Sequence, residues 1–166
     1  SRVRKRQLLI SAVFFLFSSG GIFASPEELN LSYTLESGYD YFGAMQILDR
    51  ISAESPKSYF IQLRAGWLSY LAGQYSKSVQ YYQNASALKP ESIESRTGMM
   101  LPLMALGKYK QAEVVGLTVL KVDQNNYLAK SRLAYSLYMS GEYKQCEKYY
   151  AEIVAQYPSD TTMSMG

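Results

Sequence analysis

Apolar and polar side chains between residues 25 and 160 follow the spacing of paired amphipathic helices. The clearest stretch, residues 59–92, predicts one helix, a glycine turn, a second helix and a proline stop. In its first helix, Trp67, Tyr70 and Leu71 lie about one helical turn apart and share one face. The pattern therefore predicts an all-α chain built from helix–turn–helix units.

The same stretch recurs along the chain at a fixed interval. Equal steps from Tyr75 lead forward to Tyr109 and Tyr143 and back to Tyr41. The punctuating glycines and prolines that recur with them are Gly73, Gly107, Gly141, Pro56, Pro90 and Pro158. This interval, of about 34 residues, resembles that of the tetratricopeptide repeat family, which implies a right-handed superhelical solenoid of stacked helix pairs. The resemblance also implies a function in binding other proteins.

Four repeats of this kind fit the sequence between Ser25 and Asp160. Their expected bounds are 25–58, 59–92, 93–126 and 127–160, followed by residues 161–166 as the start of a further helix or a tail. A solenoid normally ends in a polar capping helix, so we expect the sequence to belong to a longer protein. In the third repeat, Pro102 presses on the carbonyl of Gly98, where we expect a kink and not a break.

Residues 1–24 have the order of a secretory signal. Four cations among the first six positions precede the apolar run 8–17, and small or apolar residues lead to Ala24. The run is shorter than the roughly 20 residues that span a bilayer, which favours export and cleavage after Ala24. We expect a bacterial periplasmic or cell-envelope location. An uncleaved membrane anchor stays open, because no charge occurs from residue 7 to residue 26.

The net charge of +3 comes from this N-terminal segment alone. Without residues 1–24 the chain has 13 basic and 14 acidic side chains, a net charge of −1. Such a balance gives no electrostatic footprint for nucleic acid. We expect no nucleic-acid partner, and membrane contact only through the N-terminal segment if it is uncleaved.

The residue types needed for catalysis and metal binding are scarce. The chain has no histidine and one cysteine, Cys146, which we interpret as a small apolar filler between helices. Glycine-rich phosphate-binding motifs and nucleophile motifs are absent from the sequence. We therefore expect no enzyme activity, no metal site and no cofactor.

The informative side chains are aromatic, with 16 tyrosines that all follow residue 32. We expect Tyr41, Tyr75, Tyr109 and Tyr143, which open the second helix of each repeat, to be structural. In tetratricopeptide folds the first helices line a concave groove. The groove residues that this resemblance implies are Tyr33, Phe60, Leu63, Trp67, Tyr70, Leu101, Met104, Tyr135 and Tyr138. No lysine, arginine or asparagine occupies these positions, which argues against a clamp for a terminal carboxylate.

The sequence thus predicts a non-catalytic interaction or scaffold module of an exported protein. Its aromatic groove would hold a protein or peptide ligand, or another domain of the same protein, because a large apolar surface indicates a partner without identifying it. The alternative is the leading periplasmic structural domain of a larger cell-envelope protein, such as one continuing into an outer-membrane β-barrel.

Overall fold

The computed structural model describes residues 25–157, which form eight α-helices and no strand. The helices are α2 (Pro26–Ser37), α3 (Tyr41–Glu54), α4 (Tyr59–Leu71), α5 (Tyr75–Leu88), α6 (Ile93–Ala105), α7 (Tyr109–Val122), α8 (Tyr127–Met139) and α9 (Tyr143–Gln156). The predicted signal, the closing Pro158 and residues 161–166 lie outside the described residues.

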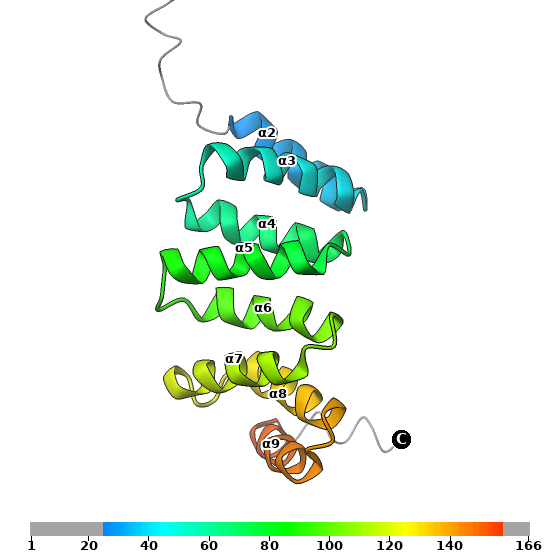
Figure 1. The fold of residues 1–166 in the computed structure, drawn as a ribbon, viewed down its shortest axis with the longest axis vertical. Coiled ribbons are helices and arrows are strands. Elements are labelled where there is room, and N and C mark those ends of the chain that lie inside the picture. Colours follow the sequence, from blue (N-terminus) through cyan, green and yellow to red (C-terminus); the bar gives the residue numbers. More distant parts are fainter. Residues whose placement is uncertain (1–24, 158–166) are drawn as a thin grey trace, which may run out of the picture.

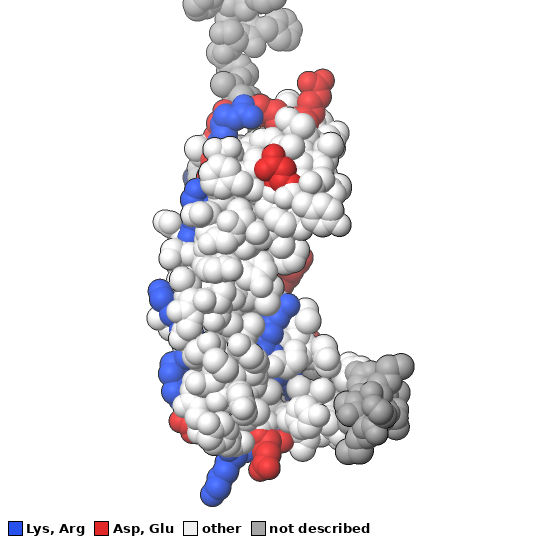
Figure 2. Space-filling model, turned by 90° about the vertical axis from the view of Figure 1, so that its right-hand side faces the viewer, with Lys and Arg blue, Asp and Glu red and all other residues white. Residues whose placement is uncertain are grey.

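The helices stack in chain order, each packed against the helix before it and the helix after it (Figure 1). The first helices of successive repeats also touch, α4 with α6 and α6 with α8. Seen from the side that carries the turns within repeats, the molecule is bowed, with a hollow on the right of the view (Figure 2). The predicted all-α solenoid of helix pairs is confirmed.

A polar side chain caps the first helix of every repeat. Ser25, Ser58, Ser92 and Asn126 directly precede these helices and accept hydrogen bonds from the backbone amides of Glu28, Ile61, Ser95 and Ala129 at 2.9–3.4 Å. Each cap satisfies an amide that the first helical turn leaves without a partner. The repeating caps explain why each first helix begins at the same point of its repeat.

The turns inside the repeats share a left-handed residue. Gly73, Gly107 and Gly141 have φ angles of 74°, 71° and 81°. The equivalent residue of the first repeat is Tyr39, with a φ of 65°. A non-glycine residue in this region costs roughly 1–2 kcal/mol, so the first turn is strained. Gly38, which precedes Tyr39, has an ordinary negative φ.

Small side chains are buried where helices cross. Ala44, Ser78 and Ala112 are fully buried at equivalent positions, and Cys146 is half-buried. Around them the core forms three clusters along the stack, which contain Leu48 and Leu68, Tyr82 and Leu103, and Leu133 and Leu137.

The tyrosines that open the second helices differ in burial: Tyr41, Tyr75 and Tyr109 are half-buried, whereas Tyr143 is 62% exposed and its ring lies 5.6 Å from that of Tyr138. Among residues 25–157, α9 is the last helix of the stack. The helix α6 runs through Pro102 without a break, as expected.

Candidate functional site

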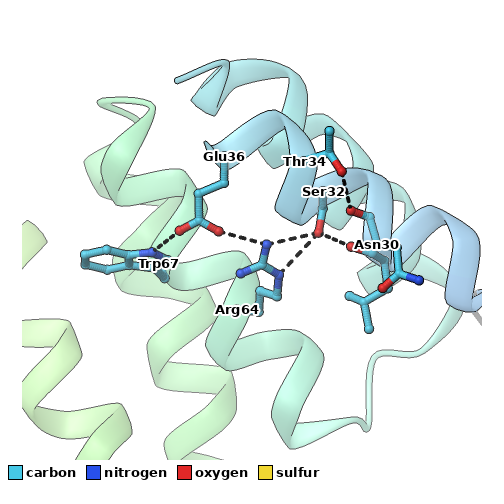
Figure 3. A network of polar contacts seen from close by, with 7 residues as sticks. Asn30, Ser32, Thr34, Glu36, Arg64 and Trp67 are labelled. Atoms are coloured by element: carbon cyan, nitrogen blue, oxygen red, sulfur yellow. Dashed lines mark hydrogen bonds and ion pairs between the residues drawn. The ribbon is translucent and has the colours of Figure 1, made fainter. Parts of the chain in front are cut away.

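The groove begins at a polar network that joins α2 to α4 (Figure 3). Arg64 donates from Nη2 to Oε2 of Glu36 at 2.9 Å, and Trp67 donates from Nε1 to Oε1 of the same carboxylate at 2.8 Å. Arg64 also donates to Oγ of Ser32, and its guanidinium lies 3.5 Å from the centroid of the Tyr33 ring. The network neutralises Arg64, whose side chain is 8% exposed, and fixes the Trp67 ring.

Tyr82 of α5 reaches the same groove from the second helix of its repeat. Its ring passes between two glycines, because an ideal Cβ would lie 3.0 Å from the ring at Gly66 and 2.5 Å from it at Gly98. Burial, the largest cause, raises the pKa of the Tyr82 hydroxyl above its usual value.

These side chains line an open cavity of about 310 Å³. Its wall includes Tyr33 of α2, Phe60, Leu63, Arg64 and Trp67 of α4, Tyr82 of α5, Glu94, Thr97, Gly98 and Leu101 of α6, and Leu128 and Arg132 of α8. The first helices supply most of the lining, and the lining is mainly apolar and aromatic. Such a cavity suits one bulky apolar side chain of a ligand.

Arg132 forms the far side of the cavity. Its Nη1 donates to the carbonyl oxygen of Thr97 at 2.6 Å, and no carboxylate of the described residues lies within ion-pair distance of its guanidinium. Burial lowers the pKa of Arg132 from its usual value. The groove therefore contains one neutralised guanidinium, Arg64, and one that is available to an anion.

The structure brings five of the predicted groove residues to this cavity, namely Tyr33, Phe60, Leu63, Trp67 and Leu101. The other four lie elsewhere. Tyr135 and Tyr138 line a separate cavity of about 330 Å³ between α8 and α9. Tyr70 lies between the rings of Trp67 and Tyr75, at centroid distances of 5.9 and 5.8 Å. Met104 packs against the core cluster that contains Leu103.

The sequence interpretation missed the charged and phenolic residues of the cavity. None of the positions predicted to line the groove is a cation, but Arg64 and Arg132 line the cavity beside them. A signal was present, because residues 64, 98 and 132 occupy equivalent positions of successive repeats. Gly98 takes the middle position of this row and leaves room there for the ring of Tyr82.

No helix among residues 25–157 combines the length and the apolar character needed to cross a bilayer.

Comparisons with known proteins agree on the fold. The tetratricopeptide repeat family matches residues 129–160 of the chain, and no curated protein sequence matches. The structure of MamA from residue 41 onward, from Desulfovibrio magneticus RS-1, superposes with a TM-score of 0.74 at 16% identity, over 83% of this chain and 77% of that one. The Sgt2 tetratricopeptide domain from Aspergillus fumigatus gives 0.62 at 15% identity, over 73% and 83%.

A third similar structure contains a bound peptide. The second tetratricopeptide domain of the human RPAP3 protein, in complex with the HSP70 peptide SGPTIEEVD, has a TM-score of 0.64 and 16% identity, over 70% of this chain and 98% of that one. At these identities the similarities show a shared fold. The chain folds as a tetratricopeptide solenoid.

Proposed function

We propose that the chain is a non-catalytic module that binds a segment of a partner protein in the groove between Tyr33 and Arg132. A bulky apolar side chain of the ligand enters the cavity beside Trp67, and a ligand carboxylate pairs with Arg132. The observation that carries this proposal is the half-buried guanidinium of Arg132, which faces an aromatic cavity without a carboxylate partner among the described residues.

An unpaired charge in such a place is costly, because burial removes water from it without supplying an opposite charge. The carbonyl of Thr97 satisfies one N–H of the Arg132 guanidinium. A guanidinium has five donors in a planar fork that suits a carboxylate. A ligand carboxylate would therefore gain charge-assisted hydrogen bonds here at a site that has already lost part of its hydration.

The apolar part of the ligand has a rigid wall to pack against. Trp67 is 37% exposed, and its indole is held by Glu36. Phe60 and Leu101 complete the apolar lining. Aromatic side chains contribute about 150–250 Å² of contact area each and often dominate interface energetics.

The acidic HSP70 peptide bound by the RPAP3 domain supports the charge of the ligand proposed for this chain. Because the two chains are only 16% identical, this support comes from the shared fold and the acidic ligand and not from matching residues.

A random peptide library displayed on phage, panned against the full chain, tests this function. Enriched peptides are expected to carry an acidic residue close to a bulky apolar residue. Panning against Arg132→Gln should remove the acidic preference, and panning against Trp67→Ala should remove the apolar preference. Enrichment without an acidic preference, or the same preference with Arg132→Gln, would contradict the proposal.

The proposal places this binding after export, in a bacterial periplasm or cell envelope, on the support of the N-terminal sequence. Fusing residues 1–24 to alkaline phosphatase, which is active only when exported, tests this location. An active fusion that mass spectrometry finds shortened after Ala24 is the expected result. An inactive fusion of full length would refute export.

A second candidate, a structural domain of a larger cell-envelope protein, rests on the outer face of α9. Ala112 and Val119 of the third repeat are 0% and 1% exposed, but no residue of α9 is fully buried. Tyr150 of α9 is 59% exposed. This face would suit another domain of the same protein. Adding a designed polar helix after Asp160 should then raise the unfolding midpoint, and an unchanged midpoint would count against this candidate.

A further inference from the structure

A second apolar surface lies on α7, away from the groove. Val114 and Leu117 are 64% and 37% exposed and lie one helical turn apart, and Val122 at the end of the helix is 71% exposed. The solenoid itself does not require apolar residues there. The residues equivalent to Val114 in the other repeats are Gln46, Gln80 and Lys148, and those equivalent to Leu117 are Asp49, Gln83 and Ala151.

Clefts flank this helix on both sides. The cleft between α7 and α9 has a volume of about 460 Å³ and that between α5 and α7 about 400 Å³, and Val114 lines both. The second helices of the repeats contribute most of both linings, whereas first helices line most of the groove. Side chains of a partner could therefore insert on either side of Val114.

The cleft between α7 and α9 carries an excess of positive charge. Lys121 and Lys148 line it, and neither forms an ion pair with a described residue. The third lysine of the lining, Lys130, is neutralised by Glu152, the single acidic residue of the lining, at 3.2 Å. In Figure 2, basic side chains follow the edge of the molecule opposite the hollow.

The hydroxyl of Thr118, which also lines this cleft, needs no further partner. The hydroxyl of Thr118 donates to the carbonyl oxygen of Val114 within α7 at 2.9 Å. A ligand can cover this residue without leaving its hydroxyl unsatisfied.

We propose that the cleft between α7 and α9 docks an amphipathic helix of a partner protein. Apolar side chains of that helix pack against Val114 and Leu117, and its acidic side chains lie beside Lys121 and Lys148. An apolar cleft with charged margins suits a helix that presents apolar residues every third or fourth position. The apolar side chains line a recess, so they fit the ridge of a helix better than the plane of a lipid surface.

Fluorescence anisotropy of two synthetic peptides tests this docking. Both form amphipathic helices with a leucine face, and one has glutamates along its margins where the other has lysines. The full chain is expected to bind the glutamate peptide, more weakly as salt is raised, because the margin contacts are exposed charges.

A double variant, Val114→Gln with Leu117→Gln, provides the matched test of the apolar contact, since the second repeat has glutamine at both equivalent positions. It should fold normally, retain peptide binding in the groove and bind the glutamate peptide at least about tenfold more weakly, roughly 1.4 kcal/mol. The charge reversal Lys121→Glu with Lys148→Glu should transfer the preference to the lysine peptide.

Absence of binding by the glutamate peptide, or equal binding by both peptides, would overturn the proposal. So would unchanged binding by the Val114→Gln, Leu117→Gln variant. Anionic phosphatidylglycerol vesicles serve as the competing probe. If they bind through Val114 and Leu117 and the glutamate peptide does not, the surface contacts a membrane and the docked helix is refuted.

Discussion

An ideal Cβ on Gly98 would lie 2.5 Å from Cε1 of Tyr82, so the ring of Tyr82 occupies the space that any other residue at position 98 would need. The ring cannot withdraw, because Gly66 lies on the opposite side with an ideal Cβ 3.0 Å from Cδ2 and Cε2. Tyr82 thus fills the junction of α4 and α6 and forms part of the cavity wall. The groove therefore depends on glycines as much as on aromatics.

Gly98→Ala is expected to destabilise the protein although alanine favours helices. The steric conflict with Tyr82 should lower the free energy of unfolding by about 1–3 kcal/mol, more than the roughly 1 kcal/mol that alanine gains in helix propensity. Urea unfolding measures the change. The Tyr82→Leu variant lacks the ring, so Gly98→Ala should be neutral or stabilising in that background. If Gly98→Ala changes the free energy of unfolding equally in both backgrounds, the contact between residue 98 and Tyr82 is refuted.

The strained turn of the first repeat offers a stabilising substitution. Tyr39 adopts a φ of 65° where the other repeats have glycine, and its side chain is 80% exposed. Tyr39→Asn should raise the free energy of unfolding by about 1 kcal/mol, because asparagine tolerates the left-handed region. Thermal unfolding monitored by circular dichroism detects this gain. A loss of stability would mean that the edge contact of Tyr39 with Tyr41 outweighs the strain.

The carboxylate of Glu36 has two partners, and substitutions can separate them. Glu36→Gln removes the counterion of Arg64 and should cost about 1–3 kcal/mol, because the Arg64 side chain is 8% exposed. Glutamine keeps an oxygen that can accept from Trp67, whereas alanine does not. Trp67 emission should therefore change more in Glu36→Ala than in Glu36→Gln. Equal emission in the two variants would contradict the hydrogen bond to Trp67.

Alkaline pH is expected to destabilise the fold through two tyrosines of α5. Burial, with the hydrogen bond to Asp49, raises the pKa of Tyr81 to about 12 from 10.0. Burial likewise raises the pKa of Tyr82. Because the unfolded tyrosines release their protons first, stability should be constant up to about pH 10 and fall as the pH approaches 12. Urea midpoints measured against pH should show this fall, and it should be shallower in Tyr81→Phe.

Much of the fold followed from the sequence because its signals repeat. A tyrosine recurs at residues 41, 75, 109 and 143 of the four repeats and a glycine at 73, 107 and 141 of the last three, so a single repeat predicts its neighbours. The left-handed conformation of Tyr39 could not be predicted, because a glycine, Gly38, directly precedes it and adopts an ordinary negative φ. Which residue of the turn takes the left-handed conformation can be seen only in the three-dimensional structure.

The apolar half of the cavity could be predicted and its polar half could not. One register of the repeat contains Tyr33, Trp67, Leu101 and Tyr135, which were expected to form one row. The first three line this cavity, whereas Tyr135 lines the cavity between α8 and α9. Gly98 was interpreted as relief for Pro102, whereas the structure shows it making room for Tyr82 from another helix. Such contacts depend on how far a side chain extends toward the next repeat. The spacing of residues along the sequence gives no information about this distance.

The emission of Trp67 tests the central claim most directly, because it is the only tryptophan of the chain and it forms a wall of the cavity. An acidic peptide selected from the library is titrated into the full chain and into Arg132→Gln. The account predicts that saturation shifts the emission to shorter wavelength and that Arg132→Gln weakens binding at least about tenfold. Peptide binding that leaves Trp67 emission unchanged, or equal affinity for Arg132→Gln, would contradict it.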